Sequence, residues 1–477
     1  MKIQQAVHKR SNAPIRVLQY GEGNFLRAFV DQMIDIANEK GMFDGRVAIV
    51  KPIRYGSLDR FDKQDNLYTV VLRGKENGEV VDSSRIITSV AEVIDAEEDY
   101  DRYMALAELE TLRFVVSNTT EAGIVLDEND HFNGLPETYP GKLTKFLYAR
   151  YNAFGGAADK GLILLPVELI ENNGGKLKEC VLALAAVWQL PQTFIDWVNE
   201  TCIFCSTLVD RIVTGYPKEA AAICEKLGYE DELLDVGEPF ALWVIESKQD
   251  IRNELPLDKA GLPVIFTDDQ RPYRERKVRI LNGAHTSTVL AAFLAGKDIV
   301  RECMEDPIIA GFMRKVVFDE VIPALPAGAT DSEAFAAAVF ERFANPFIDH
   351  KLLSISLNSV SKWKARCLGS FKDSLAKTGK LPQGLTFSFA ALIAFYLGGE
   401  INGHEVYPLQ DDQAVLTFFE NVRKAHNSAE NTVLTVAKNA DFWGEDLSQI
   451  DGFVETVAGY LESILTDGAY KAMEKVQ

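Results

Sequence analysis

Residues 15–27 read IRVLQYGEGNFLR, and this stretch decides the fold class. The apolar run 15–19 is typical of a short buried strand, and Gly21 and Gly23 then make a tight turn. A helix is predicted next, because apolar residues recur at three- and four-residue spacing at Phe25, Phe29, Met33 and Ile36. Such a unit binds the pyrophosphate of a dinucleotide, since the glycines admit a close approach and the helix offers free N–H groups. The third glycine of that fingerprint would fall at Leu26, so a turn without a ligand is the alternative interpretation.

The first half of the chain continues to alternate strands with helical patterns. Further strands are predicted at 46–50, 68–72, 85–86, 112–116 and 161–166. Strands that alternate with helices build a parallel sheet through right-handed crossovers. From about Lys277 onward the pattern is mainly helical. We therefore expect an α/β Rossmann-type dinucleotide-binding domain over residues 1–270 and a mainly α-helical substrate and catalytic domain over residues 271–477.

Composition narrows the class of protein. The chain has 477 residues, with 50 Lys and Arg against 70 Asp and Glu, a formal net charge of −20. That charge argues against a nucleic-acid binder and against binding to anionic membranes. Six cysteines are too few for a disulfide framework, and the pair Cys202-x-x-Cys205 is interpreted as two structural thiols. The apolar stretches are shorter than a membrane span, and a leader segment is not visible, so we expect a cytoplasmic protein.

The second predicted strand bears on the choice of cofactor. An Asp or Glu at its end usually binds the adenosine ribose of NAD. Here the strand runs into Lys51, Pro52, Ile53 and Arg54. Two cations without an acid favour the 2′-phosphate of NADP, whereas cations that point to solvent would favour neither cofactor. Both NAD and NADP remain open on this ground.

A basic segment opens the second half. Residues 271–285 read RPYRERKVRILNGAH, with five cations in nine residues. A solvated helix face is the ordinary explanation. However, Asn282 and His285 lie three residues apart on one helical face, and Lys277 precedes them. A desolvated lysine can act as a proton donor and acceptor, while an amide and an imidazole polarise a carbonyl. Lys277 and His285 would lie about 12 Å apart along a regular helix, so an irregular helix must bring them together.

These residues also carry a family resemblance. KVRILNGAH matches the K-x4-N-x2-H signature of the polyol-specific long-chain dehydrogenases, the mannitol dehydrogenase family, and YGEGNFLRAF resembles its cofactor turn. Further similar blocks occur in the expected order at 64–69, 117–123, 208–212, 238–246 and 342–366. The resemblance implies NAD-linked oxidation and reduction of a small sugar derivative, with no metal.

The resemblance also implies individual roles. Lys277 would be the catalytic acid/base, and Asn282 and His285 would orient and polarise the carbonyl. Lys362 and Asp210 would contact the substrate. The implied cofactor-binding residues are Gly21, Glu22, Gly23, Asn24, Phe25, Arg27, Ser117, Thr120 and Glu121.

Two departures from the family pattern concern the substrate. Mannitol-type members carry an asparagine where this chain has Glu168-Leu169, and an arginine where it has Ser354. Both changes argue against a simple polyol and fit a uronate or aldonate whose carboxylate meets another cation. Arg274, Arg279 and Arg366 are the candidates. The alternatives are another uronate or polyol dehydrogenase of the family, and a regulatory protein that binds NAD without turnover. The intact Lys277, Asn282 and His285 argue against the regulator.

Overall fold

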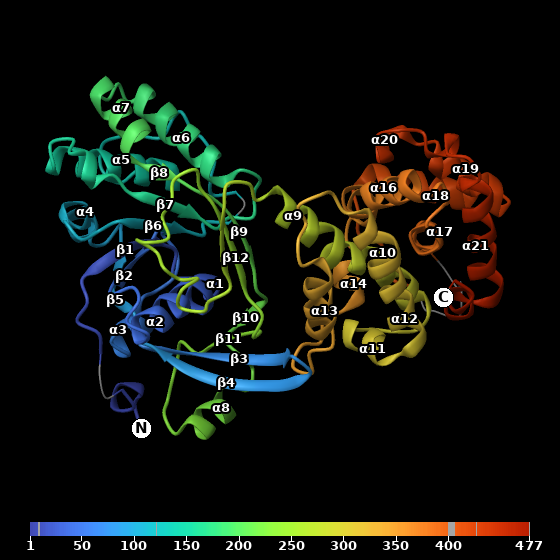
Figure 1. Ribbon diagram of the computed structural model, residues 1–477, viewed down its shortest axis with the longest axis horizontal. Helices are drawn as coiled ribbons and strands as arrows, with labels where there is room; N and C mark the ends of the chain where they lie inside the picture. The colour runs from blue at the N-terminus through green and yellow to red at the C-terminus, as the bar shows by residue number, and fades with distance from the viewer. Residues whose placement is uncertain (8–9, 121, 399–405, 426, 477) are drawn as a thin grey trace. The chain divides into compact units, whose positions relative to one another are not determined.

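The computed structural model describes residues 1–7, 10–120, 122–398, 406–425 and 427–476 (Figure 1). The chain forms two compact units. The first contains residues 1–73 and 80–270, and the second contains residues 74–79 and 271–477. The strands are β1 (Ile15–Tyr20), β2 (Arg46–Lys51), β3 (Tyr68–Glu76), β4 (Glu79–Ile87), β5 (Val90–Asp95), β6 (Phe114–Ser117), β7 (Ile163–Pro166), β8 (Ile203–Phe204), β9 (Ser206–Asp210), β10 (Val213–Gly215), β11 (Asp235–Gly237), β12 (Leu242–Glu246) and β13 (Val264–Thr267).

The centre of the first unit is a six-stranded sheet in the order β5-β2-β1-β6-β7-β8. All of its neighbouring strands are parallel. The order runs outward from β1 in one direction and then from β6 in the other, which is the doubly wound Rossmann arrangement. The predicted α/β fold class is therefore confirmed. The helical elements of this unit are η1 (Ile3–Gln5), α1 (Asn24–Leu26), η2 (Arg27–Asp31), α2 (Gln32–Glu39), α3 (Asp59–Lys63), α4 (Tyr100–Ala105), η3 (Leu106–Glu108), α5 (Tyr139–Ala153), η4 (Ala158–Lys160), α6 (Asn173–Val187), α7 (Gln192–Thr201) and α8 (Ala220–Leu227).

Both faces of this sheet are buried, which explains why β2, β6 and β7 contain the continuous apolar runs VAIV, FVV and ILLP rather than an alternating pattern. Val17 of β1 joins a core with Phe29, Met33 and Trp243 on one face. Leu18, the next residue, joins a second core with Phe146 on the other face. The second core is covered by α5, α6 and α7, which lie together along that side of the sheet (Figure 1). The sheet thus holds the carboxyl ends of β1, β2 and β6 in fixed positions.

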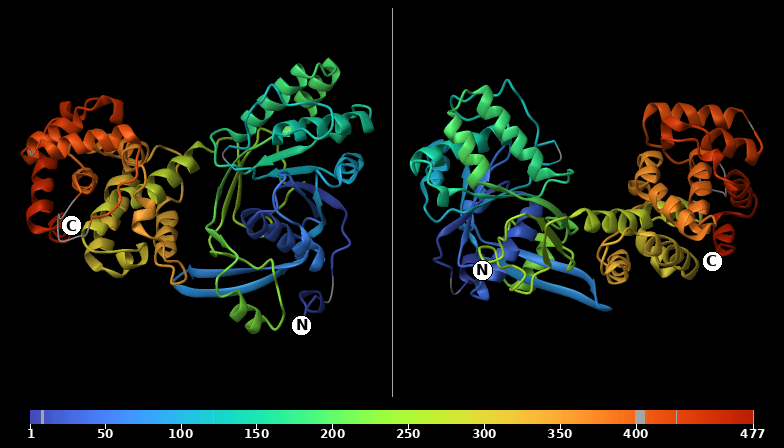
Figure 2. Two further views of the ribbon diagram at one scale, coloured as in Figure 1. Left: turned by 180° about the vertical axis from the view of Figure 1, so that it is seen from behind. Right: turned by 45° about the horizontal axis from the view of Figure 1, so that its top comes forward.

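Two strands predicted within the alternating series lie outside the parallel sheet. β3 and β4 are neighbours in a separate four-stranded sheet of order β10-β11-β3-β4. They form a pair of long strands that extends away from the six-stranded sheet (Figure 2). Asn77 and Gly78 connect them with φ of 53° and 81°, the left-handed conformations that an Asn-Gly hairpin turn requires. The tip belongs to the second unit, where the Glu341 carboxylate accepts hydrogen bonds from both N–H groups at 2.9 and 2.7 Å.

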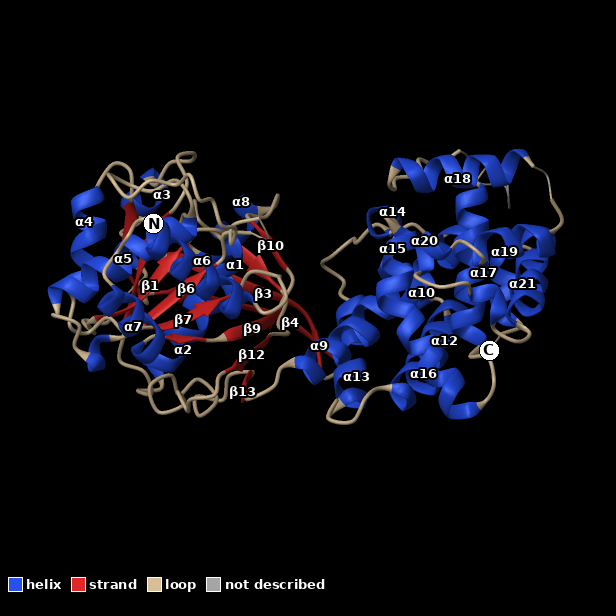
Figure 3. Cartoon of the chain, turned by 90° about the horizontal axis from the view of Figure 1, so that it is seen from above, coloured by secondary structure: helices blue, strands red, loops and turns tan. Residues whose placement is uncertain are grey.

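The remainder of the second unit is helical in its described part (Figure 3). Every residue of α10 is buried, α17 packs against it, and α21 packs on α17. The helical elements are α9 (Arg271–Lys277), η5 (Val278–Asn282), α10 (Gly283–Leu294), α11 (Val300–Glu305), α12 (Pro307–Lys315), η6 (Val316–Val321), η7 (Ile322–Ala324), α13 (Ser332–Phe343), α14 (Leu352–Ile355), α15 (Ser359–Trp363), η8 (Lys364–Leu368), α16 (Gly369–Thr378), α17 (Gln383–Leu397), α18 (Gln413–Lys424), α19 (Ala429–Ala437), α20 (Ala440–Trp443), η10 (Leu447–Gln449), α21 (Phe453–Asp467) and α22 (Ala469–Glu474).

Two further observations concern the chain as a whole. Across the described residues, no helix is both long and apolar enough to cross a bilayer. The cysteines are free thiols, and burial raises the pKa of Cys202 to about 11 and that of Cys205 to about 12. These two thiols are therefore inert at neutral pH.

Candidate active site

The glycine turn lies at the point where the strand order reverses. β1 and β6 are parallel neighbours, and Gly21 follows the first while Asn118 follows the second. Gly21 has φ of 119°, and a Cβ on it would approach the Asn118 carbonyl oxygen to 3.4 Å. Glycine is therefore favoured there by the backbone conformation, while a Cβ would make only an ordinary contact with the neighbouring backbone. In open α/β sheets a ligand binds at this reversal, outside the carboxyl ends of the strands.

A cavity of about 380 Å³ opens over the turn. Its walls are the Gly21–Gly23 turn, residues 118–120 after β6, and Pro52 and Ile53 after β2. Gly23 caps a helical segment that continues through α1, η2 and α2 to Glu39. A Cβ on Gly23 would meet nothing within 4 Å, so the space in front of the helix N-terminus is open. Open space, free N–H groups and a positive helix end fit the pyrophosphate of a dinucleotide.

The predicted cofactor residues divide into two groups. Gly21, Glu22, Gly23 and Thr120 line the cavity. Four others do not line it: Asn24, Phe25, Arg27 and Ser117. Phe25 stacks on Phe29 at 5.0 Å between ring centroids, and the buried Ser117 donates to the Glu168 carboxylate at 3.1 Å. Glu121 lies outside the described residues. The cofactor roles of all nine residues remain predictions.

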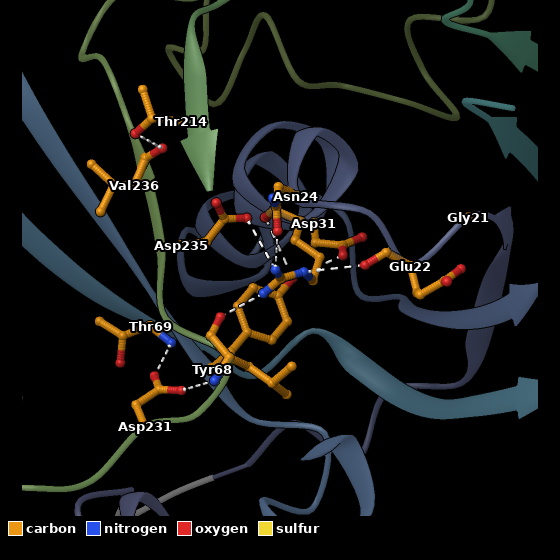
Figure 4. Close-up of polar contacts among 12 residues, drawn as sticks. Gly21, Glu22, Asn24, Asp31, Tyr68, Thr69, Thr214, Asp231, Asp235 and Val236 are labelled. Carbon is orange, nitrogen blue, oxygen red and sulfur yellow. Dashed lines mark hydrogen bonds and ion pairs between the residues drawn. The ribbon is translucent and has the colours of Figure 1, made fainter. Parts of the chain in front are cut away.

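Arg27 does not line the cavity and instead contacts the turn and the segment at β11. Figure 4 draws the polar contacts in this region, with Glu22, Asn24 and Asp235 labelled. The Arg27 guanidinium donates to the Glu22 carbonyl at 3.2 Å, to the Asn24 side-chain oxygen at 2.5 Å and to the Leu233 carbonyl at 2.6 Å. It also lies 3.6 Å from the Asp235 carboxylate. One buried side chain therefore ties the middle of the turn and the first residue of α1 to the chain segment at β11, which indicates a positioning role.

Two carboxyl groups are buried beside Arg27. Tyr68 donates to Asp31 at 2.8 Å, and the oxygens of Asp235 have no hydrogen-bond partner among the described residues. Burial raises the pKa of Asp31 to about 7, against the opposing effect of hydrogen bonds from Tyr68 and Gln19. Burial likewise raises the pKa of Asp235 to about 7, although the charge of Arg27 opposes the rise. The protonated and ionised forms of each carboxyl group are therefore similarly populated at neutral pH.

Lys51 and Arg54, the two cations at and after the end of β2, are paired with carboxylates. They line a second cavity next to the one over the glycine turn. Lys51 Nζ lies 2.6 Å from the Asp95 carboxylate and donates to the Gly56 carbonyl at 2.8 Å. Arg54 lies 2.6 Å from Glu137 and 3.4 Å from Glu97. The charge of these two cations was the reason to consider NADP. Because carboxylates already pair with both, they are less able to bind a 2′-phosphate.

Glu168 lies at a position where the sequence departs from the mannitol-type pattern. Both of its carboxylate oxygens accept hydrogen bonds from residues of the first unit. It accepts hydrogen bonds from the Thr119 N–H and hydroxyl, each at 2.9 Å, and from Ser117. Burial raises its pKa, and these hydrogen bonds oppose the rise. The carboxylate therefore fixes the loop after β6, which forms one wall of the cavity.

In the second unit, Lys277, Asn282 and His285 lie on one continuous helical segment. Lys277 ends α9, Asn282 ends the π-helical segment η5, and His285 lies in α10. In a regular α-helix, residues five apart point roughly 140° away from each other. A π turn closes on the fifth residue instead of the fourth, which brings Lys277 and Asn282 toward one face. An irregularity of the expected kind therefore lies between Lys277 and His285, while their approach to one another remains a prediction.

His285 is buried and held in one orientation. Its ring stacks on Phe343 at 4.0 Å between centroids and meets the His350 ring edge at 5.6 Å. Nε2 has no hydrogen-bond partner among the described residues. Burial lowers the pKa of His285 well below its usual value, and the charges of His350, Arg342, Arg366 and Lys362 lower it further. The imidazole is therefore neutral at pH 7, and its buried Nε2 has unused hydrogen-bonding capacity.

The substrate-binding candidates are placed differently from one another. Arg366, in η8, donates to the Thr286 hydroxyl at 3.4 Å, beside His285. Lys362 donates to the Ile355 carbonyl at 2.9 Å. Arg279 is paired with Glu275 at 2.8 Å and with Asp373 at 2.5 Å. The half-buried Arg274 lies in α9, and the buried Asp210 ends β9 in the first unit.

Sequence reasoning missed Arg342. This residue is 6% exposed in α13, and its charge acts on His285. Its position at the start of the family-like block 342–366 was the available signal. The charges of Arg342, Arg366 and Lys362 all act on His285, so its surroundings are electrically positive, which favours an anionic ligand.

The doubly wound sheet, the glycine turn and the cavity over it define a Rossmann-type dinucleotide-binding domain joined to a helical unit. The sequence model of the mannitol dehydrogenase Rossmann domain matches residues 15–259, and that of the mannitol dehydrogenase C-terminal domain matches residues 269–465. The chain belongs to the mannitol dehydrogenase family, as its motifs predicted.

Similar proteins cover nearly the whole chain. It is 46% identical over 467 residues to the altronate oxidoreductase of Shigella flexneri, with 96% of each chain covered. It is 47% identical to that of Klebsiella pneumoniae (strain 342), with 97% of this chain and 96% of the relative covered.

Solved structures share the fold. A D-sorbitol dehydrogenase in substrate-free form has a TM-score of 0.77 at 21% identity, with 96% of this chain and 95% of that chain covered. A ternary complex of Pseudomonas fluorescens mannitol 2-dehydrogenase with NAD and D-mannitol has a TM-score of 0.66 at 22% identity, with 98% and 95% covered.

Proposed function

We propose that this protein is an NAD-dependent oxidoreductase that reversibly reduces D-tagaturonate to D-altronate in hexuronate catabolism. The observation that carries the proposal is the sequence identity of 46–47% over almost the full length to proteins named altronate oxidoreductase. The cations around His285 support an acidic substrate, because a uronate brings a carboxylate that a polyol lacks.

The cofactor is NAD. The open glycine turn and the helix N-terminus would hold the pyrophosphate, and Thr120 would line the same cavity. NADH supplies the hydride when it is bound. Arg27 fixes the backbone of the turn and so orients its N–H groups.

Lys277 is the acid/base of the reaction. In reduction its ammonium donates a proton to the carbonyl oxygen, and in oxidation its amine accepts that proton from the hydroxyl. The π-helical segment brings Asn282 toward the same face, where its amide donates to the substrate oxygen. The neutral His285 orients that oxygen through its free Nε2. Asp210 and Lys362 are assigned to the sugar hydroxyls on family resemblance.

Arg366 is the leading candidate for the substrate carboxylate. It is half-buried beside Thr286 and His285, and an arginine fork donates two parallel hydrogen bonds to a carboxylate. Arg279 is the weaker candidate because two carboxylates already bind it. Arg274 remains a third candidate.

A substrate panel tests the proposal. Tagaturonate, fructuronate and fructose are offered with NADH and NADPH, and altronate, mannonate and mannitol with NAD, while absorbance at 340 nm is followed. We expect the highest kcat/KM with the tagaturonate and altronate pair. A preference for fructuronate and mannonate, or for fructose and mannitol, would assign another activity of the family. Dinucleotide binding without turnover of any substrate would indicate a regulatory protein.

A further inference from the structure

A second cavity, of about 570 Å³, adjoins the one over the glycine turn. The two share Pro52, Ile53 and Glu137 as lining residues. A dinucleotide with its pyrophosphate at the glycine turn extends its adenosine half toward the end of the second strand. The second cavity lies at that end, because the last residues of β2 and β5 line it.

The charges that line this cavity balance. Three cations, Lys51, Arg54 and Lys142, face three carboxylates, Asp95, Glu97 and Glu137. Each cation is engaged: Lys51 by Asp95, Arg54 by Glu97 and Glu137, and Lys142 by the Glu137 carbonyl at 2.6 Å. A 2′-phosphate would add up to two negative charges to a site with no surplus cation. A neutral ribose hydroxyl meets no such penalty.

Strand register supplies the acid that β2 lacks. β2 and β5 are parallel neighbours, and Lys51 is the direct register partner of Asp95. The carboxylate therefore lies at the carboxyl edge of the sheet, one strand away from its usual position. Its side chain is 12% exposed and lines the cavity.

Asp95 is ionised and has acceptor capacity left. Oδ2 accepts from Lys51, and Oδ1 accepts from the Glu97 N–H at 3.0 Å. Burial alone would raise the pKa of Asp95, but these hydrogen bonds lower it below its ordinary value. A carboxylate has about four acceptor sites, so Oδ2 can still accept one hydroxyl.

We propose that Asp95 accepts the adenosine ribose 2′-hydroxyl of NAD in place of the missing acid at the end of β2, and that Asp95, Glu97 and Glu137 together exclude the 2′-phosphate of NADP. This inference rests on the proposed NAD-dependent function.

Binding measurements test the inference without reference to turnover. Dissociation constants for NADH, NADPH and 2′-deoxyadenosine NADH are measured by fluorescence titration or calorimetry. Wild type should bind NADH about tenfold or more tightly than either analogue. Asp95→Asn should weaken NADH binding about tenfold and leave the 2′-deoxy analogue unchanged. Glu98→Gln is the matched control, because this exposed neighbour carries the same charge but does not line the cavity.

A second pair of variants separates ribose binding from the support of Lys51. Lys51→Met/Asp95→Asn removes both partners, so no unpaired charge remains beneath the cavity. Its NADH affinity should stay low, whereas recovery to the wild-type value would show that Asp95 only holds Lys51 and would overturn the inference.

Glu97→Gln/Glu137→Gln should strengthen NADPH binding about tenfold. Unchanged NADPH affinity there, or an unchanged NADH constant in Asp95→Asn, would also overturn it. Failure of wild type to bind either cofactor would instead refute the proposed function.

Discussion

Lys277 shows how one side chain depends on an irregularity of the backbone that carries it. The π-helical segment η5 rotates Lys277 toward Asn282, and His285 follows three residues later on an ordinary helical face. We predict that Lys277→Ala lowers kcat for tagaturonate by about 10²–10⁴, because the transition state loses its proton donor. NADH affinity, measured by titration, should remain near the wild-type value. Turnover above a tenth of wild type would remove Lys277 from the mechanism.

Arg366 differs from Arg279 in what already binds it. Arg279 is paired with two carboxylates, while Arg366 donates a 3.4 Å hydrogen bond to the Thr286 hydroxyl. We predict that Arg366→Ala raises KM for tagaturonate about 10- to 100-fold, the loss expected for a charge-assisted bond. Arg279→Ala should change KM less than threefold and serves as the matched control. Arg366→Lys should recover part of the affinity. Equal KM values for wild type and Arg366→Ala would place the carboxylate elsewhere, with Arg274 and Arg342 as the next variants.

Among the elements, the helix after the glycine turn carries a pH-sensitive group. The pKa of Asp31 is raised to about 7 by burial, from an ordinary value near 4. The folded state therefore holds a proton that the unfolded state releases between these values. The stabilisation that the protonated Asp31 contributes to the folded state is fully present below about pH 4, and it is lost as the pH rises through 7.

We predict that Asp31→Asn removes this dependence. Thermal unfolding followed by circular dichroism at pH 5 and pH 8 should show a smaller loss of stability in the variant, by about 2–4 kcal/mol. The asparagine oxygen can still accept from Tyr68, so the fold should persist. Glu110→Gln, at an exposed position, controls for the removal of one negative charge. Parallel pH profiles for wild type and Asp31→Asn would show that Asp31 does not titrate in this range.

At the scale of the whole molecule, sequence reasoning reached the features that have a local cause. The β1-turn-helix unit follows from apolar runs, glycine and periodicity, and the Rossmann class follows from their repetition. The separate sheet of β3 and β4 did not follow, because a strand's partner is set by tertiary packing and not by its own sequence. Likewise the pairing of Lys51 with Asp95 depends on strand register across 43 intervening positions, and the role of Arg27 depends on a contact with Leu233.

The charge of the whole chain supplies the final prediction. At −20 the protein repels an anionic uronate at long range, while the proposed site has positive charges near His285 from Arg342, Lys362 and Arg366 that would attract it. The Debye length falls from about 30 Å at 10 mM salt to about 8 Å at 150 mM, so added salt screens the distant charges more than the near ones. We therefore predict that kcat/KM for tagaturonate, at saturating NADH, rises at least about twofold over this range. A neutral ketose, if turned over, should show no such rise. A fall in kcat/KM for tagaturonate with salt would mean that the local cations dominate the approach of the substrate even at long range.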